Sequence, residues 1–362
     1  MDAIKAVILV SVITLWTLLY LAFKNRRGRL QVYPLALILR LGITLKPGRA
    51  GRKTIILGWL GFALLILAMV EFYYEVANLI YFKYLKQVPE ASSAGLVPFI
   101  PGVTVPWSKM PYFLIALGIA VLVHELSHAL QARYEGFKVK NAGLALIAFI
   151  PAAFVELDEE ELSKAPLSSR LRVYSAGVAS NMILGLILLG IVASGCGVLT
   201  HGVKILSIDE GSPAYLAGLK PGDIIIGVNG EEALCLRDLI AKLKSLGVGD
   251  PSIESNFELE ILREGRSIKL TVTKPKGQQY IGIQIINEYT TLGLILYPLQ
   301  MLNIALALIN AAPLFITDGG RVLTDILSKL AGEAGKVLST GIQVATLLLV
   351  LSLITITPIL PG

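Results

Sequence analysis

Long runs of apolar residues recur along the chain and set its class. Six runs approach or exceed the roughly 20 residues needed to cross a bilayer, and they cover residues 3–23, 54–82, 111–134, 170–195, 291–316 and 335–358. The first run also has features of a secretory signal, but its long apolar core and the lack of a small-residue cleavage site favour a retained anchor. The pattern predicts a polytopic α-helical membrane protein with about six transmembrane helices.

Two shorter apolar stretches do not fit as spans. Residues 95–106 carry three prolines, and residues 143–157 are too short to cross and contain Pro151. Irregular backbone at membrane depth is tolerated only where it is buried in protein or lines a wet cavity. We therefore expect two re-entrant or interfacial segments, with residues 143–155 rich in β-structure. A surface loop is nearly as good an interpretation of residues 95–106.

Residues 199–288 break the apolar pattern. The stretches 257–265 and 266–274 alternate apolar and polar residues around a short turn, which predicts a β-hairpin. Residues 236–246 have helical spacing of leucine and isoleucine. This region is therefore expected to be one inserted α+β domain, which divides the chain into a membrane region at 1–198, the insertion at 199–288 and a second membrane region at 289–362.

Composition and charge agree with this class. The chain of 362 residues is 54% hydrophobic and only 16% charged, whereas soluble domains are roughly one quarter charged. Basic residues gather without any acid in residues 24–53, so the positive-inside rule places this loop in the cytoplasm and, by parity, residues 199–288 outside. The loop shows no aromatic pattern for base stacking, which argues against nucleic acid as a partner. We expect an integral protein of the plasma membrane.

The cysteines, Cys196 and Cys235, are too few for a disulfide framework. The simpler interpretation is two small apolar residues, and a bridge is possible only if the fold brings the two thiols together.

A metal-binding pattern lies within an apolar run. Residues 124–128 read His-Glu-Leu-Ser-His, and on a helix His124 and His128 share one face, where both imidazoles can bind one Zn²⁺. Glu125 lies close enough to take a proton from a metal-activated water. The alternative is a pair of hydrogen-bonded core histidines. The third histidine of the chain, His201, is expected at the surface of the insertion.

A catalytic zinc needs a third protein ligand and one open position. Asp318 is the best candidate, because parity places it at the cytoplasmic end of an inward-running helix, at the depth of the histidines. Taken alone, Asp318 and Gly319 would be interpreted as a helix-terminating turn. We expect one Zn²⁺ per chain.

These residues resemble the site-2 protease family of intramembrane zinc metalloproteases over nearly the whole chain. The resemblance rests on the histidine motif, on an A-G-x-x-x-N motif at residues 176–181 and on an N-x-x-P-x-x-x-x-D-G motif at residues 310–319. Residues 101–106 and 153–157 resemble segments of the archaeal and eukaryotic branch. The chain departs from the family pattern at Val178 and Thr317, which leaves the shape of the cavity open.

The resemblance implies zinc at His124, His128 and Asp318, with Glu125 as the general base. It also implies that Asn181 and Asn310 bind substrate, although amides within apolar helices equally serve to join helices. The implied substrate is a membrane protein, cut in or near a transmembrane helix within lipid. Such a helix must open into an extended strand before hydrolysis, and the edge of the β-rich segment 143–155 is the candidate to capture it.

Residues 199–288 resemble a single PDZ domain. The resemblance implies a peptide-binding loop at Tyr215, Leu216, Ala217, Gly218 and Leu219. The domain then either filters substrates by size or caps the membrane part.

Two other classes of function remain as alternatives: a metal-binding membrane transporter and a non-catalytic PDZ scaffold. The chain shows no repeated halves of the transporter type, and it carries a base placed for hydrolysis. A membrane-anchored zincin acting on soluble protein would need its metal outside the bilayer. The substrate and the oligomeric state are not set by the sequence.

Overall fold

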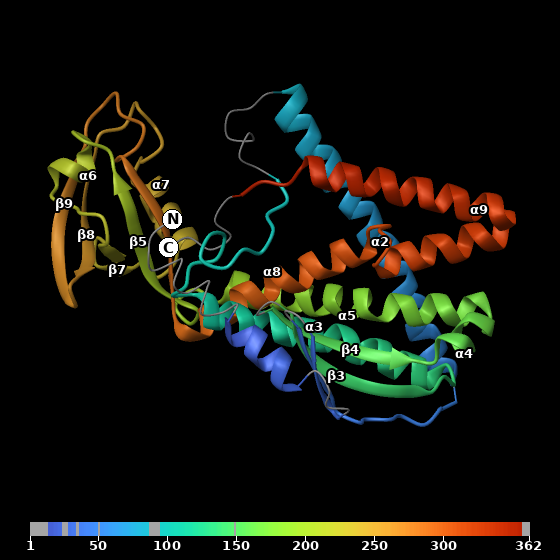
Figure 1. The fold of residues 1–362 in the computed structure, drawn as a ribbon. Helices are drawn as coiled ribbons and strands as arrows, with labels where there is room; N and C mark the ends of the chain where they lie inside the picture. Colours follow the sequence, from blue (N-terminus) through green and yellow to red (C-terminus); the bar gives the residue numbers. More distant parts are fainter. Residues whose placement is uncertain are drawn as a thin grey trace. The chain divides into compact units, whose positions relative to one another are not determined.

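The computed structural model describes residues 14–23, 28–33, 36–49, 51–86, 95–147 and 150–356 (Figure 1). The chain forms two compact units, one from residues 1–186 and 298–362 and the other from residues 187–297.

Five helices among the described residues are long and apolar enough to cross a membrane. They are α2 (Arg52–Ile80), extended by the π-helical turn η1 (Tyr81–Leu85), α3 (Met110–Tyr134), α5 (Leu167–Ser194), α8 (Thr291–Ala311) and α9 (Asp318–Ser352). They confirm a polytopic membrane protein. The first predicted run is represented by an apolar helix at Thr14–Phe23, and residues 3–13 of that run lie outside the described residues.

Helix α9 is two helices joined at a sharp bend, which the sequence pattern did not reveal. Gly332 has φ 58° and ψ −130°, a conformation that favours glycine. Beyond it the chain doubles back (Figure 1), so that Thr324 Oγ1 lies 2.8 Å from Ser339 Oγ and Gln343 Nε2 donates to Thr324 Oγ1 at 3.1 Å. The second half matches the predicted run at 335–358. The first half was missed because Asp318, Arg321, Asp325 and Lys329 interrupt its hydropathy.

Small residues allow the helices of the first unit to approach closely. Ala307 and Ala311 of α8 are fully buried, and they share a core with Leu65 of α2, Val178 of α5 and Val322 of α9. In a membrane such contacts supply association through van der Waals packing, since lipid is as apolar as the helix surfaces. The end of α8 and the start of α9, which flank the loop between them, therefore share a core with α5.

A four-stranded antiparallel sheet accompanies the helices. Its strands are β1 (Leu30–Tyr33), β2 (Ala36–Arg40), β3 (Val139–Ile147) and β4 (Ile150–Leu157), in the order β1-β2-β3-β4. The β-structure expected near residues 143–155 is present, and β4 is an edge strand. The two strands from the basic loop were not predicted. The short helix α4 (Glu159–Lys164) follows β4, and residues 95–106 form turns and isolated bridges rather than helix.

The second unit is a sheet domain with the helices α6 (Pro213–Leu216) and α7 (Leu236–Ser245). Its strands are β5 (Thr200–Ile208), β6 (Ile224–Val228), β7 (Glu231–Glu232), β8 (Ser255–Arg263), β9 (Arg266–Lys274) and β10 (Ile283–Tyr289). The order is β10-β5-β6-β8-β9, with β7 on β6. The predicted hairpin is β8–β9 and the predicted helix is α7. Val203, Ile225, Leu239, Leu259 and Val272 are among its buried core residues.

The interpretation of the cysteines as unpaired apolar residues is wrong. Cys196 and Cys235 form a disulfide, with Cα atoms 5.4 Å apart. The fold brings the turn after α5 to the N-terminus of α7, although 39 positions separate the two residues in sequence.

Candidate active site and metal centre

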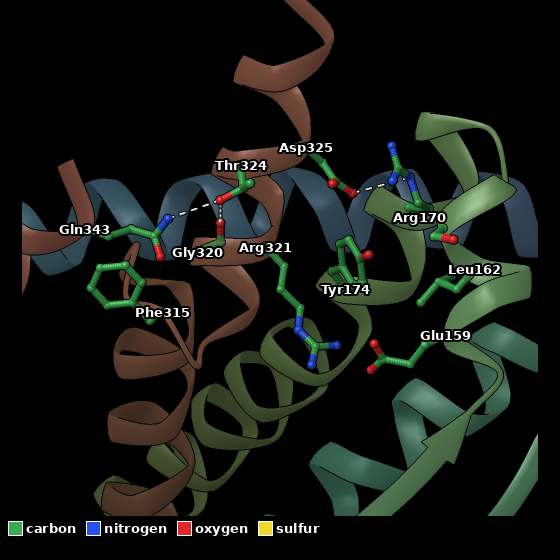
Figure 2. A pocket seen from close by; sticks show the side chains of 11 residues that line it. Glu159, Leu162, Arg170, Tyr174, Phe315, Gly320, Arg321, Thr324, Asp325 and Gln343 are labelled. Atoms are coloured by element: carbon green, nitrogen blue, oxygen red, sulfur yellow. Dashed lines mark hydrogen bonds and ion pairs between the residues drawn. The ribbon is translucent and has the colours of Figure 1, made fainter. Parts of the chain in front are cut away.

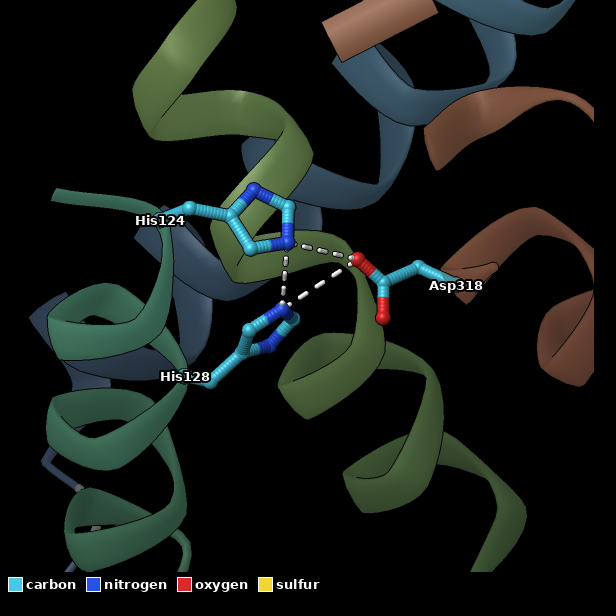
Figure 3. Close-up of side chains that lie close together, drawn as sticks. All are labelled: His124, His128 and Asp318. Atoms are coloured by element: carbon cyan, nitrogen blue, oxygen red, sulfur yellow. Dashed lines mark hydrogen bonds and ion pairs between the residues drawn. The ribbon is translucent and has the colours of Figure 1, made fainter. Parts of the chain in front are cut away.

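Three side chains converge at one point between α3 and the start of α9 (Figure 3). His124 and His128 lie one turn apart on the same face of α3, and Asp318 is the first residue of α9. Asp318 Oδ2 lies 3.3 Å from His124 Nε2 and 3.2 Å from His128 Nε2, and the two Nε2 atoms are 3.1 Å apart. His124 is 8% exposed. The structure thus brings together the three residues expected to bind the metal.

The hydrogen bonds of the two rings determine which nitrogen faces the centre. His128 Nδ1 lies 2.8 Å from the carbonyl oxygen of Val173, which can only accept, so Nδ1 carries the proton. His124 Nδ1 lies 2.6 Å from Asn181 Oδ1. The Asn181 amide nitrogen donates elsewhere, so its oxygen accepts from His124. Both Nε2 atoms therefore present lone pairs toward Asp318.

This donor set fits a zinc ion. Two imidazole lone pairs and a carboxylate oxygen face one another, and Asp318 Oδ2 is buried with no hydrogen-bond partner. Three acceptors at such distances repel unless a cation lies among them, and their ligand atoms all fall within 4.8 Å of one another. Histidine and carboxylate ligands with one open position are typical of catalytic zinc. Zinc is the cofactor of this site.

Helix α5 passes so close to the rings that only glycine fits there. A Cβ atom on Gly177 would lie 2.4 Å from His128 Nε2 and 2.6 Å from His124 Nε2. The glycine of the 176–181 motif therefore leaves the space in which the two imidazoles meet, a role that the sequence analysis did not assign.

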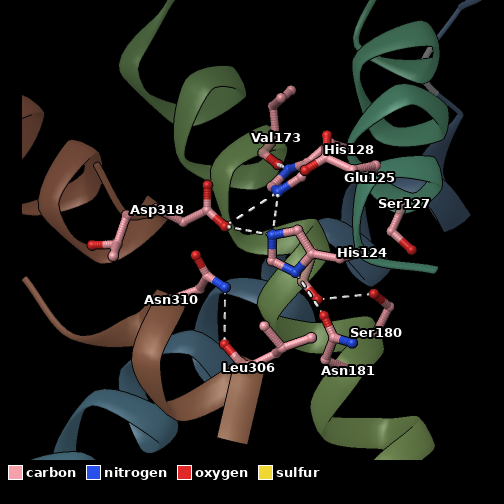
Figure 4. Close-up of polar contacts among 12 residues, drawn as sticks. His124, Glu125, Ser127, His128, Val173, Ser180, Asn181, Leu306, Asn310 and Asp318 are labelled. Atoms are coloured by element: carbon pink, nitrogen blue, oxygen red, sulfur yellow. Dashed lines mark hydrogen bonds and ion pairs between the residues drawn. The ribbon is translucent and has the colours of Figure 1, made fainter. Parts of the chain in front are cut away.

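Glu125 is held beside the metal ligands by the edge strand. Its Oε2 accepts a hydrogen bond from the backbone N–H of Val155 in β4 at 3.1 Å, and Figure 4 shows it next to His128. Glu125, the three metal ligands and Asn310 line one cavity of about 210 Å³. The carboxylate expected as general base thus faces the space where a substrate would lie.

The two asparagines differ in their surroundings. Asn181 is fully buried, and its amide donates to Ala120 O at 3.1 Å and to Asn303 Oδ1 at 2.7 Å. Its oxygen accepts from His124, so the contacts of Asn181 in this structure position a metal ligand, and substrate binding by Asn181 stays a prediction. Asn310 donates to Leu306 O at 3.0 Å, and its side chain lies on the cavity wall (Figure 4). Substrate binding by Asn310 stays a prediction.

Asn303 belongs to this network and was missed by the sequence analysis. It is fully buried in α8, and its amide donates to Leu299 O at 2.7 Å. The only signal in the sequence was an amide within an apolar helix, which does not name its partner.

The expected peptide-binding loop at Tyr215–Leu219 has no free donor. Each of its backbone N–H groups is bonded within residues 212–219, to Ser212, Pro213, Ala214 or Tyr215. A loop that captures a carboxylate needs unpaired N–H groups. Residues 280–282, which precede the edge strand β10, have backbone N–H groups with no partner among the described residues, and this feature was also missed.

Apolar helices of membrane length, a His-His-Asp metal centre and an adjacent glutamate define a membrane-bound zinc metalloprotease. The model of peptidase family M50 matches residues 112–352, and the chain belongs to this family, which contains the site-2 proteases.

Three relatives illustrate the similarity. An uncharacterised protein of Methanocaldococcus jannaschii is 27% identical over 359 residues, which cover 96% of this chain and 94% of that protein. A membrane-bound transcription factor site-2 protease homolog of Arabidopsis thaliana is 32% identical over 145 residues, or 38% of this chain and 28% of that protein. Zinc metalloprotease RasP of Shouchella clausii is 27% identical over 190 residues, or 51% and 45%. The matched part of the chain thus spans less than half the length of each of the two relatives that are named as proteases.

Proposed function

We propose that the protein is an intramembrane zinc endopeptidase, which hydrolyses peptide bonds in or near the transmembrane helices of membrane-protein substrates. One observation carries this proposal: Glu125 lies in the same cavity as the metal ligands and is hydrogen bonded to the edge strand β4. A base, a metal centre and a strand able to accept an extended peptide therefore meet in one place.

Each residue of the site has its own role in hydrolysis. Zinc, held by His124, His128 and Asp318, would supply Lewis acidity and lower the pKa of a water molecule to about 7. Glu125 takes the proton of the attacking water and passes it to the leaving amine. The backbone N–H of Val155 holds one oxygen of Glu125, which leaves the other to face the cavity. Asn181 orients His124, and Asn310 on the cavity wall offers an amide oxygen to the substrate backbone.

Strand β4 is the proposed docking edge for the opened substrate helix. The Val155 N–H donates to Glu125 rather than to β3, so every second residue, including Ala153, also directs its backbone groups away from β3. Pro151 is another of these alternate residues, and as a proline it has no backbone N–H that could remain unpaired. A substrate strand that pairs at Ala153 would run beside Val155, which lines the metal cavity, and its peptide bond would there be exposed to attack.

The proposed orientation places the metal centre toward the cytoplasm and the second unit outside. The acid-free basic segment 24–53 supports a cytoplasmic location for that loop. The Cys196–Cys235 bridge supports an extracytoplasmic location for the second unit, because disulfides persist in oxidising compartments. The two arguments rest on different residues and agree.

The second unit is proposed to be a PDZ-like domain that limits access by substrate size. If it also takes a peptide terminus, the N–H groups of residues 280–282 before β10, which have no partner in the described part of the chain, are better placed than Tyr215–Leu219. Deleting residues 202–286 should admit substrates with larger ectodomains if the unit filters, and should change nothing if it only caps.

The test is to purify the full chain in detergent and to measure bound zinc together with cleavage of a transmembrane-helix reporter. Wild type should hold about one zinc and cleave. Glu125→Gln should keep zinc and lose cleavage, because the base is gone, and Asp318→Asn should lose both. Normal cleavage by Glu125→Gln, or zinc transport into vesicles without any cleavage, would contradict the protease proposal.

A further inference from the structure

A second cavity, of about 320 Å³ (Figure 2), adjoins the metal cavity. Glu159, Leu162, Tyr174 and Arg321 line both cavities. A group bound at the metal centre can therefore contact these four side chains.

Arg321 is placed to reach the metal centre. It follows Asp318 by three positions on α9, and helical side chains three apart lie on one face, with Cβ atoms roughly 5–6 Å apart. Its guanidinium carbon lies 5.8 Å from the centroid of the Tyr174 ring, a cation–π contact that steadies the side chain. In Figure 2 the guanidinium points into the cavity, toward Glu159 on the opposite wall.

Neighbouring arginines are paired with carboxylates, whereas Arg321 is not. Arg170 Nε lies 3.3 Å from Asp325 Oδ2, and Arg172 binds both oxygens of Glu135 at 2.7 and 2.6 Å. Among the described residues, no carboxylate lies within ion-pair distance of Arg321. The positive charge of Arg321 beside the metal centre is thus available to bind an anionic group of a ligand.

We propose that Arg321 is a catalytic residue that binds the carbonyl oxygen of the scissile residue as this oxygen becomes negatively charged, and then binds the product carboxylate. The inference rests on the proposed protease function. Hydrolysis of any peptide bond places negative charge on the carbonyl oxygen of the scissile residue, and this residue ends as a carboxylate. The carboxylates of Glu125, Glu159 and Asp318 already line the cavity, so a cation in addition to zinc would help to stabilise another negative charge.

The chemical step is balanced without a further reactant. The oxygen of water bonds to the carbonyl carbon, and one of its two protons moves to Glu125. Glu125 passes this proton to the nitrogen as the carbon–nitrogen bond breaks, and the second proton of water leaves the new carboxyl group for the amine. The products are an ammonium group and a carboxylate, which remains opposite Arg321. Arginine suits this role because its guanidinium is always charged and can bind both oxygens of a carboxylate.

The first experiment measures kcat, KM and bound zinc for the full chain with a reporter that wild type cleaves. Arg321→Gln should keep zinc and lower kcat about 100-fold, the usual effect of removing one oxyanion donor, with KM nearly unchanged. Arg321→Lys should recover part of kcat. The matched control is Lys329→Gln, which removes the same charge from an exposed position of α9 and should cleave as wild type does.

The second experiment measures binding rather than turnover. In Glu125→Gln protein, the product peptide that ends at the mapped cut should bind about tenfold more tightly as the free acid than as the C-terminal amide. Adding Arg321→Gln should remove that preference and leave the affinity of the amide unchanged.

Several outcomes would overturn the assignment to Arg321. Wild-type kcat in Arg321→Gln, loss of its zinc, or equal affinity of acid and amide would each do so. A defect confined to reporters with Asp or Glu beside the cut would indicate a side-chain subsite instead. Failure of the protease proposal itself is separate, because it would appear as zinc-loaded wild type that cleaves no reporter.

Discussion

The Nδ1 atom of His124 lies 2.6 Å from Oδ1 of Asn181, and this contact fixes the ring with its Nε2 lone pair toward Asp318. Asn181 is itself held by Ala120 and Asn303, in α3 and α8. Two helices besides the one carrying Asn181 therefore determine how one metal ligand is presented. Such partners commonly set the tautomer and basicity of a zinc-bound histidine.

Replacing Asn181 by leucine should weaken zinc binding by about 10- to 100-fold, the range found when partners of metal-bound histidines are lost. Competition with a chelator measures this effect directly. Asn310→Ala is the matched control, since Asn310 faces the cavity but contacts no ligand: it should keep zinc affinity and reduce cleavage. Wild-type zinc affinity in Asn181→Leu would show that the hydrogen bond does not position His124.

Gly177→Ala should abolish zinc binding while the protein remains folded. The added Cβ would lie 2.4 Å from His128 Nε2, so one ring or the α5 backbone must move. Gly190→Ala makes the same change on the same helix at a position with no atom within 4 Å, and it should bind zinc normally. Zinc content and thermal unfolding in detergent would be compared for both variants. Normal zinc content in Gly177→Ala would mean that the helices can separate at little cost.

Lys274→Met should destabilise the second unit by several kcal/mol. The Lys274 ammonium is fully buried and donates to the carbonyls of Asp250, Ile253 and Gln278 at 2.9, 2.5 and 2.9 Å. Each carbonyl left without a donor costs about 1–3 kcal/mol. Hydrogen exchange of the full chain would report the change in residues 247–282.

The control for this substitution is Lys269→Met, at an exposed lysine of the same strand that pairs with Glu258. An exposed ion pair contributes roughly 0–1 kcal/mol, so exchange should change little. Equal protection in the two variants would contradict the structural role of Lys274.

The thiols of Cys196 and Cys235 should resist alkylation in the native protein until a reductant is added. The bridge closes a loop of 39 positions, for which chain entropy predicts a stabilisation of about 4 kcal/mol. Cys235→Ser should therefore lower the stability of the second unit and expose one reactive thiol. The protein would be taken from membranes prepared under alkylating conditions. If both thiols react there without reductant, the bridge is contradicted, and so is the extracytoplasmic location that it supports.

Much of the secondary structure and part of the metal site could be predicted from patterns of residues within short segments of the sequence. Hydropathy located most of the membrane helices because a span needs a long apolar segment, and alternation located the β8–β9 hairpin because each strand has one buried face. The i, i+4 spacing of His124 and His128 sufficed for two metal ligands, since it lies within one helix. Residues 318–331 escaped the hydropathy pattern because Asp318, Arg321 and Asp325 face the metal or the adjoining cavities, and Lys329 is exposed.

Relationships between distant segments were decided by tertiary structure. The sequence by itself determined the membrane class, the zinc motif and the inserted domain, because these depend on residues close together in the chain. The partner of Asn181, the space left by Gly177, the bridge between the cysteines and the unpaired charge of Arg321 all depend on which helices and loops meet. The chemistry of an amide, glycine, thiol or guanidinium is compatible with many partners, and only packing selects one.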